Sequence, residues 1–443
     1  RYRKDLRKLN FATIDGEDAK DFDDAVYCVK NSNSFTLYVA IADVSFYVTP
    51  GSKIDIEAKK RGTSIYFPET VIPMLPENLS NGICSLRPNE DRCSMICEMS
   101  IGLDGKRKKY KFYSGLINSK ARLTYNQVEK NLNKSFNIKQ AGVRASIEHL
   151  KDLANLRLKL RHQRKALEIK PIEATLELDK NKEVKNLHIK KPLFAHKLVE
   201  ESMLLANESA AEFMQERLNL GVYRIHEDPD PSKLEALKKH FQISPKQVKK
   251  LSSLEVVNLC LDQANKKNDT TGQILVLQTL ARAEYSTNNL GHFGLQLGQY
   301  SHFTSPIRRY PDLLVHRLIN SSLAQKKIQT RQNELQDECE NSSMLERRAE
   351  KASRQVEQVL ICTYLKTKIG STMDGVVTGV TDFGLFVNLE PYFISGLLHV
   401  SDLPDDRYHF LPDRNALKGK RRGGIYKLGQ TIKVKIAAIF PLE

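Results

Sequence analysis

An acidic run near the start of the chain is the segment best suited to chemistry. Six of the ten residues from 15 to 24 are Asp or Glu, although the whole chain carries a formal charge of +16. Carboxylates packed this closely repel one another, so the run is costly unless cations compensate it. Hard carboxylate oxygens are the ligands that Mg²⁺, Mn²⁺ and Ca²⁺ prefer. The run therefore predicts a metal site.

The alternative is a solvated acidic loop, which is what most charged runs are. Apolar residues, among them Ile14 and Phe22, are interleaved with the acids, so part of the run should pack against a core. Gly16 permits a tight turn that would bring Asp15 back toward Asp21. These two details favour a built site over a solvated loop.

A calcium loop of the EF-hand type fits poorly, because Lys20 and Val26 occupy the positions that need Gly and Glu. A catalytic Mg²⁺ site therefore outranks a calcium-binding loop. In a basic chain, carboxylates that hold one or two hard cations are what a phosphodiester-cleaving enzyme needs. The cations would polarise the phosphate and activate water near neutral pH.

A second segment, 301–310, carries adjacent arginines. Ser305 followed by Pro306 is a helix-start signal, so Arg308 and Arg309 are expected in the first helical turn. Free N–H groups at a helix start attract anions, and two arginines there would form a phosphate clamp. A structural role for one of the arginines is an equally good interpretation. The nearby histidines are expected to be structural rather than metal ligands: His292, His302 and His316.

The elements that position these residues follow from hydrophobic periodicity. Alternating apolar residues predict a strand over 34–44, and spacing of three to four predicts helices over 193–218 and 332–366. The sequence pattern changes near 367–370 from helical spacing to alternating apolar and polar residues with Gly, which predicts short strands of a small β-domain. We expect strands and loops over 1–115, helical structure over 124–168, a mixed α/β (α+β) domain over 1–366 and an all-β domain over 370–443.

Composition sets further limits on the class of protein. Apolar residues make up 40% of the chain, but no apolar run approaches the roughly 20 residues that a membrane span needs. We therefore do not expect a membrane protein. Seven cysteines without a Cys-x-x-Cys pair argue against disulfides and zinc ribbons and favour a cytoplasmic location. The positive charge favours nucleic acid as a partner. Because the chain starts at Arg1 rather than Met, we expect it to be a fragment.

Several motifs together resemble the RNase II/RNase R (RNB) family, and the RNase R branch more than RNase II. The resemblance covers nearly all of residues 1–366 and rests on the segments 13–25, 39–44, 64–68, 73–76, 85–88 and 291–317. It implies a hydrolytic, processive 3′→5′ exoribonuclease that releases 5′-nucleotide monophosphates. It also implies a narrow channel that admits single-stranded RNA, Mg²⁺ or Mn²⁺ as cofactor, and a monomer.

The resemblance assigns roles to individual residues. Asp15, Asp21, Asp23 and Asp24 match the carboxylates around the metal, and Arg308 matches the arginine that stabilises the phosphate. The RNA contacts that it implies are base stacking by Tyr66, the channel end at Tyr125, and sugar recognition by Glu346. Ile169 is nearest to a position where relatives often carry a Phe that sandwiches the last bases. An aliphatic side chain lacks the aromatic face, so either the expected clamp is weaker or another residue supplies it.

The last domain resembles an S1-type RNA-binding OB-fold, with Phe383 and His399 as candidate base-stacking residues. Phe386 would either join them or point into the barrel. A run without acids should track phosphates, a solvated loop being the alternative: Lys418, Lys420, Arg421, Arg422 and Lys427. The cold-shock domains that usually precede the family's catalytic domain are not in this sequence.

Two other classes of function remain open from the sequence. One is a non-catalytic RNA-binding protein that uses the OB domain and the basic surface. The other is a metal-dependent endonuclease of broader specificity. The intact set of four aspartates together with Arg308 argues against the first.

Overall fold

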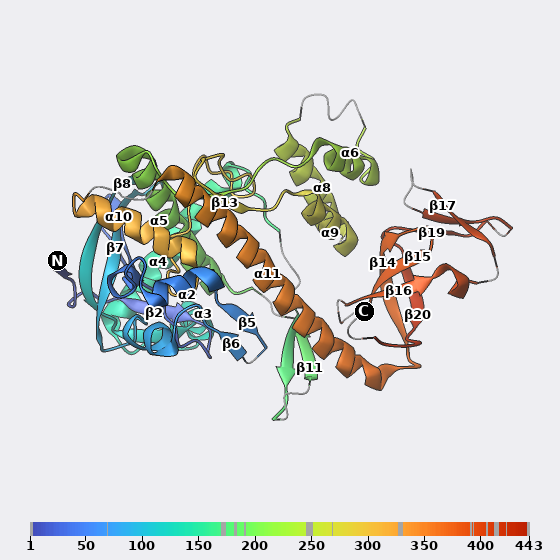
Figure 1. Ribbon diagram of the computed structural model, residues 1–443, viewed down its shortest axis with the longest axis horizontal. Helices are drawn as coiled ribbons and strands as arrows, with labels where there is room; N and C mark the ends of the chain where they lie inside the picture. Colours follow the sequence, from blue (N-terminus) through green and yellow to red (C-terminus); the bar gives the residue numbers. More distant parts are fainter. Residues whose placement is uncertain are drawn as a thin grey trace.

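Figure 1 presents the computed structural model of the chain. Its N-terminus lies beside a large sheet and its C-terminus beside a separate small barrel. The structure describes residues 3–68, 70–169, 174–180, 184–189, 192–244, 251–267, 269–326, 331–389, 392, 394–404, 406–411, 416–421 and 423–440.

The largest element within the described residues is a mixed seven-stranded sheet with the order β1-β8-β7-β4-β3-β2-β9. The edge pairs β1–β8 and β2–β9 are parallel and the inner pairs are antiparallel. Its strands are β1 (Lys4–Asp5), β2 (Ala12–Asp15), β3 (Asp24–Lys30), β4 (Ser34–Ala42), β7 (Asp91–Gly102), β8 (Arg107–Asn118) and β9 (Ala121–Thr124).

Both faces of this sheet are buried under helices. On one face Leu37 of β4 shares an apolar cluster with Leu150 and Leu205, and on the other Ala40 packs with Leu313. Burying apolar area on both sides supplies the main driving force for this fold. The helices are α1 (Val44–Tyr47), α2 (Lys53–Arg61), a π-helix (Asn78–Ile83), α3 (Tyr125–Leu132), α4 (Ala141–Gln163), α5 (Phe194–Leu218) and α10 (Tyr310–Leu323).

A second group of elements lies between the sheet and the barrel (Figure 1). The long helix α11 (Gln332–Leu365) runs from the sheet body toward the barrel. The helices α6 (Pro231–His240), α8 (Ser253–Lys267) and α9 (Thr270–Thr279) pack against one another. The hairpins are β5 (Ile65–Phe67) with β6 (Thr70–Ile72) and β10 (Ala174–Leu178) with β11 (Val184–Ile189). β12 (Tyr223–Ile225) and β13 (Glu284–Ser286) form an antiparallel pair on either side of α6, α8 and α9 in the sequence.

The C-terminal unit is small and rich in strands, and its core includes Val377, Leu385 and Leu417. A short 3-10 turn (Lys366–Lys368) joins it to α11. One sheet has the order β16-β15-β14-β20 and the other the order β17-β18-β19. The strands are β14 (Thr372–Val380), β15 (Gly384–Leu389), β16 (Ile394–His399), β17 (Tyr408–Leu411), β18 (Ala416–Gly419), β19 (Ile425–Lys427) and β20 (Thr431–Lys435), with a 3-10 turn at Val400–Asp402.

The strand and the two long helices predicted from periodicity are confirmed. β4 covers 34–42 of the predicted 34–44, with alternate side chains buried in its first half and every side chain buried from Val39 to Ala42. The helices α5 and α11 match their predicted ranges to within about a residue. The helical region 124–168 is α3 followed by α4, and α2 interrupts the first 115 residues, which were expected to be strands and loops.

The predicted helix start at Ser305 is wrong. Residues 306–308 form a turn, and α10 begins only at Tyr310, with Pro311 in its first turn. The reason is a tertiary contact: Arg309 forms an antiparallel bridge with Thr63, and its φ of −134° and ψ of 123° are extended. Arg308 and Arg309 therefore precede the helix instead of lying in its first turn.

Two expectations from composition can be compared with the described residues. All seven cysteines are free, in agreement with the predicted absence of disulfides. No helix in the described part of the chain is long and apolar enough to cross a membrane.

Candidate active site

The acidic run lies at one end of the large sheet. Asp15 ends β2 and Asp24 begins β3, and these neighbouring strands are antiparallel. The loop between them therefore leaves and re-enters the sheet at the same end. Ile14 and Phe22 are buried, as the interleaved pattern predicted, so the run is not a freely solvated loop.

The loop is fastened to the body by the segment 85–88. The Ser85 hydroxyl donates to the carbonyl of Lys20 at 2.7 Å and accepts the N–H of Phe22 at 3.0 Å. The N–H of Leu86 donates to the carbonyl of Phe22 at 2.9 Å. These bonds fix the backbone on the N-terminal side of Asp23.

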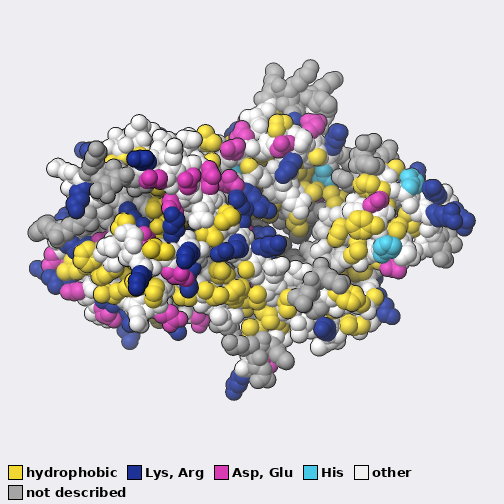
Figure 2. All heavy atoms as spheres, in the orientation of Figure 1, with side chains coloured by type: hydrophobic (Ala, Val, Ile, Leu, Met, Phe, Trp, Pro, Cys, Tyr) yellow, Lys and Arg dark blue, Asp and Glu magenta, His cyan; other side chains and the backbone are white. Residues whose placement is uncertain are grey.

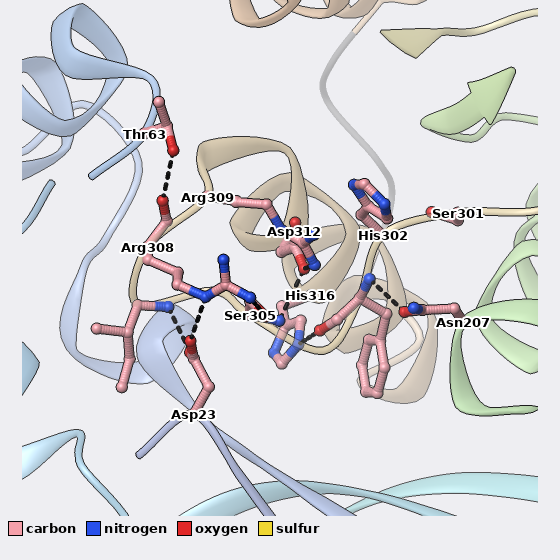
Figure 3. A network of polar contacts seen from close by, with 12 residues as sticks. Asp23, Thr63, Asn207, Ser301, His302, Ser305, Arg308, Arg309, Asp312 and His316 are labelled. Atoms are coloured by element: carbon pink, nitrogen blue, oxygen red, sulfur yellow. Dashed lines mark hydrogen bonds and ion pairs between the residues drawn. The ribbon is translucent and has the colours of Figure 1, made fainter. Parts of the chain in front are cut away.

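Asp23 connects the loop to a distant part of the chain, the turn of residues 305–309, here called the Arg308 turn (Figure 3). Its Oδ1 accepts the N–H of Ile307 at 2.8 Å, and its Oδ2 lies 3.5 Å from Nε of Arg308. The Asp23 side chain is buried, whereas that of Arg308 is 42% exposed. Arg308 therefore faces both the buried carboxylate and the solvent.

The carboxylates of Asp15, Asp21, Asp23 and Asp24 are here called the carboxylate cluster. Burial is the main influence on the ionisation of Asp15, Asp23 and Asp24, with the charges of neighbouring members added to it. Burial raises the pKa of Asp23 well above its ordinary value, and the charges of Asp21 and Asp24 add to this. Burial and the charge of Asp15 raise the pKa of Asp24 to about 7, and burial raises that of Asp15. A cation would relieve the cost of ionising these groups.

The cluster is not a preformed metal cage. Among the residues that the structure describes, no group of three or more His, Cys, Asp or Glu side chains is arranged to hold a metal ion. Mg²⁺ commonly takes one or two carboxylates and completes its shell with water and substrate phosphates. The hard oxygen donors and their mutual repulsion fit an ion that is shared with a phosphate.

Two tyrosines flank the carboxylate cluster from different elements. The hydroxyl of Tyr66, on β5, donates to Oδ2 of Asp21 at 3.3 Å, and its side chain is exposed. Tyr125, at the start of α3, stacks on His196 with ring centroids 4.1 Å apart. Burial raises the pKa of both hydroxyls, and nearby carboxylates raise it further, so both remain protonated at neutral pH.

The second arginine of the segment is turned inward. Nη2 of Arg309 donates to Oδ1 of Asp312 at 2.8 Å, and its side chain is only 17% exposed. The clamp of two phosphate-facing arginines predicted from sequence is therefore not formed: of the two, Arg308 faces the cluster and Arg309 does not.

Glu346, on α11, accepts a 2.6 Å hydrogen bond from Nη1 of Arg224.

Ile169 lies with the helices α6, α8 and α9, where it packs against an apolar cluster that includes Leu237 and Phe293. The backbone next to Ile169 is bound to the segment that carries Phe293: the N–H of Leu167 donates to the carbonyl of Gly294 at 2.9 Å. Tyr66 does not belong to this apolar cluster among the described residues. The position nearest to the expected base clamp is thus occupied by a packing residue.

The barrel presents an exposed apolar face. Phe383 and Phe386 are 46% and 38% exposed, with ring centroids 6.2 Å apart, so Phe386 does not point into the barrel. His399 is exposed on β16, opposite Gly384 of β15. Lys418, Lys420, Arg421 and Lys427 are exposed, and Arg422 lies outside the described residues. Figure 2 shows Lys and Arg side chains on the barrel and also beside a hollow near the centre of the molecule as viewed.

The three histidines near the arginines are structural, as expected. Nε2 of His316 lies 2.8 Å from the carbonyl of Phe303, and the hydroxyl of Tyr285 lies 2.8 Å from Nδ1 of His302. Burial lowers the pKa of His292 to about 3, which keeps its ring neutral.

Sequence reasoning missed Asp312 and Ser64 as parts of this site. Asp312 looks like an ordinary helical acid in the sequence, yet it is fully buried beneath the Arg308 turn. The N–H of Ser64 donates to the carbonyl of Arg308 at 3.0 Å. The proximity of Asp312 to two arginines, three and four positions earlier, was the one available signal.

Comparison with known proteins identifies related domains. The RNB domain model matches residues 3–325 and the S1 RNA binding domain model matches residues 366–439. The C-terminal strand-rich unit is thus of the S1 type. The mixed sheet and its helices correspond to the RNB domain.

Similar proteins cover almost the whole chain. Ribonuclease R of Vibrio cholerae is 39% identical over 456 residues, which are 99% of this chain and 55% of the relative. Ribonuclease R of Escherichia coli is 39% identical over 455 residues, 99% of this chain and 56% of the relative. The chain spans about half the length of these curated relatives. RNase R of Mycoplasma genitalium, solved with ribose-methylated single-stranded RNA, has a TM-score of 0.93 and 32% identity over 100% of this chain and 70% of that one.

Proposed function

Because the chain belongs to the RNB family, we propose that it is a hydrolytic, processive 3′→5′ exoribonuclease that degrades single-stranded RNA to 5′-nucleotide monophosphates. The observation that carries the proposal is the contact of Asp23, within the carboxylate cluster, with both the N–H of Ile307 and Nε of Arg308 (Figure 3). Residues 1–366 would form the catalytic domain and 370–443 the RNA-binding domain. The chain would act as a cytoplasmic monomer.

The cofactor that we propose is Mg²⁺, with Mn²⁺ as the alternative, held by Asp15, Asp21, Asp23 and Asp24. When bound, such an ion polarises the scissile phosphate and lowers the pKa of a coordinated water. The repulsion among the four carboxylates supports this assignment, because a divalent ion would offset it.

The protein's own groups have distinct tasks in this proposal. Asp23, fixed by the Ile307 N–H, orients the attacking water from a buried position. Arg308 reaches from the solvent side and stabilises the negative charge that grows on the phosphate oxygens. Tyr66, exposed beside Asp21, offers its ring to the terminal bases, and Tyr125 closes the end of the RNA channel.

In this proposal the barrel binds the RNA and takes no part in its hydrolysis. Phe383, Phe386 and His399 offer exposed rings for base stacking, and the basic residues beside them attract phosphates. Single-stranded RNA would be gathered there and threaded by its 3′ end toward the carboxylate cluster.

One assay tests the function. A uniformly labelled single-stranded RNA is incubated with the full chain, with and without Mg²⁺, at two salt concentrations. Release of 5′-mononucleotides, blocked by modification of the 3′ end and with few products of intermediate length, supports the proposal. Internal fragments would indicate an endonuclease, and binding without products a non-catalytic RNA-binding protein. Chelation of Mg²⁺ should stop cleavage and spare capture, whereas salt should weaken capture steeply.

Glu346→Ala is expected to lower the preference for RNA over DNA by about tenfold, the size of one lost hydrogen bond to a charged group. The proposed reason is that Glu346, held by Arg224, reads the 2′-hydroxyl of the sugar. The measurement is the ratio of degradation rates on RNA and DNA of the same sequence.

Glu284→Ala is the matched control for this prediction. Glu284 is also paired with an arginine, Arg347, at 2.7 Å, and its removal should leave the RNA-to-DNA ratio unchanged. An unchanged ratio in Glu346→Ala would contradict a sugar-reading role.

A further inference from the structure

The Arg308 turn rests on a buried ion pair. Asp312, in the first turn of α10, is fully buried, and its Oδ1 accepts two hydrogen bonds of 2.8 Å. One comes from the N–H of Ser305, at the start of the turn, and the other from Nη2 of Arg309, at its end. A single carboxylate oxygen thus ties both ends of a five-residue turn together.

The turn carries this constraint to the groups that face the carboxylate cluster. The Ser305 hydroxyl accepts a hydrogen bond of 3.0 Å from Nη2 of Arg308. Two residues after Ser305, the N–H of Ile307 binds Asp23. A displacement of Ser305 would therefore move both the Arg308 guanidinium and the donor that fixes Asp23 (Figure 3).

The opposite side of the turn is held by backbone contacts to a strand-like segment. The carbonyl of Arg308 accepts the N–H of Ser64 at 3.0 Å and the hydroxyl of Thr63 at 3.0 Å. These contacts fix the Arg308 main chain but do not touch its guanidinium. The guanidinium is instead held by the Ser305 hydroxyl, at the end of the turn where Asp312 acts, and by Asp23.

We infer that Asp312 and Arg309 form a positioning pair, which holds the Arg308 turn so that the Arg308 guanidinium and the Ile307 N–H meet Asp23 in a reactive geometry. This inference rests on the proposed exoribonuclease function and adds two residues to its machinery. Neither touches the RNA: Arg309 is committed to Asp312, and Asp312 acts through Ser305 and Arg308.

The test is a double-mutant cycle measured on the full chain with single-stranded RNA. Asp312→Asn keeps an oxygen for the Ser305 N–H but removes the charge that binds Arg309, and Arg309→Gln removes the charge from the other side. Each single variant should lower kcat by about 30-fold and change KM by less than about threefold, because misplacement of a positioned group by a fraction of an ångström costs rate.

The decisive measurement repeats these substitutions in an Arg308→Ala background, under single-turnover conditions. With Arg308 removed, only the part of the effect that passes through the Ile307 N–H remains, so each substitution should then cost less than about tenfold, since coupled groups are not additive. The same fractional loss with and without Arg308 would overturn the inference. A raised KM with unchanged kcat in Arg309→Gln would also overturn it, because Arg309 would then be an RNA ligand.

Asp55→Asn is the matched control. Asp55 is also buried, and its Oδ1 accepts Nη2 of Arg317 at 2.6 Å and the hydroxyl of Tyr310 at 3.0 Å, so its loss disturbs α10 without touching Ser305. It should lower the thermal midpoint and leave kcat within about threefold of the unmodified chain. An equal fall of kcat in Asp55→Asn would show that any loosening of α10 suffices, and would overturn the inference.

A variant that fails to fold and a chain that lacks the proposed activity can both be told apart from a wrong assignment of the pair. If Asp312→Asn does not fold, Ser305→Ala completes the cycle, because it deletes only the hydroxyl that links the pair to Arg308, and the same non-additivity is expected. If the unmodified chain itself releases no mononucleotides, the proposed function fails rather than the assignment of the pair.

Discussion

Asp23→Asn should reduce hydrolysis by about a thousandfold, the contribution of a well-placed carboxylate in proton transfer, while RNA binding stays nearly intact. The substitution is almost isosteric, and its amide oxygen can still accept the N–H of Ile307. What disappears is the negative charge opposite Arg308. Rates under single-turnover conditions at saturating Mg²⁺ and affinity by fluorescence anisotropy separate the two effects.

The same substitution should stabilise the folded chain in the absence of divalent ions. Burial and neighbouring carboxylates raise the pKa of Asp23, so its ionised form disfavours folding at neutral pH. For an acid whose folded pKa exceeds the unfolded one, this cost grows as the pH rises above the unfolded pKa. Asp23→Asn removes the cost, so its thermal midpoint near pH 7 in a chelating buffer should exceed that of the unmodified chain.

Asp18→Asn is the control for both measurements. Asp18 lies in the same loop but is exposed, and it is outside the carboxylate cluster. The same chemical change there should leave turnover within about twofold, because surface substitutions away from special features have small effects. Undiminished turnover by Asp23→Asn at saturating Mg²⁺ would end its proposed role.

Local periodicity was enough to predict β4, α5 and α11. Each buries a repeating face, so the signal is contained in the 9, 25 and 34 consecutive residues of these elements. The start of α10 could not be found in this way. Arg309 is held extended by Thr63, and Arg308 accepts a hydrogen bond from the same residue across 245 positions of sequence. A tertiary contact therefore overrode the Ser-Pro signal at Ser305.

In the candidate site, too, the features that lie within one short segment were predicted and those that depend on distant contacts were not. The acidic run was evident from composition, since six acids in ten residues need an explanation in a basic chain. Its meeting with the Arg308 turn was not, because the bond from Ile307 to Asp23 spans 284 positions. Asp312 went unnoticed for a related reason: a single acid on a helix gives no sign in the sequence that it will be fully buried.

Arg308→Ala should lower kcat by about a hundredfold to a thousandfold, the usual effect of deleting one group that stabilises transition-state charge. Arg308 lies between the solvent and Asp23, so its guanidinium can meet a phosphate whose other side faces the carboxylate cluster. Attraction to the ground-state phosphate is a smaller part of its role, so the KM for RNA should change far less than kcat.

Arg308→Lys separates charge from shape. A lysine keeps the positive charge but lacks the planar fork that here contacts both Asp23 and the Ser305 hydroxyl. We expect kcat of Arg308→Lys to be about tenfold higher than that of Arg308→Ala but still below that of the unmodified chain, since an ammonium acts as a point charge. Full recovery would mean that charge alone suffices, and the precise orientation set by Ser305 and Asp312 would then be irrelevant.

Arg7→Ala controls for the loss of a paired arginine in general. Arg7 is 45% exposed, close to the value for Arg308, and it pairs with Asp5 at 2.8 Å. It follows β1, at the edge of the sheet opposite β2 and β9, so its removal should leave kcat within about twofold. A comparable loss of rate in both variants would trace the effect to stability or net charge. A loss confined to Arg308 would place it at the reacting phosphate, opposite the carboxylates that we propose as the holders of the cation.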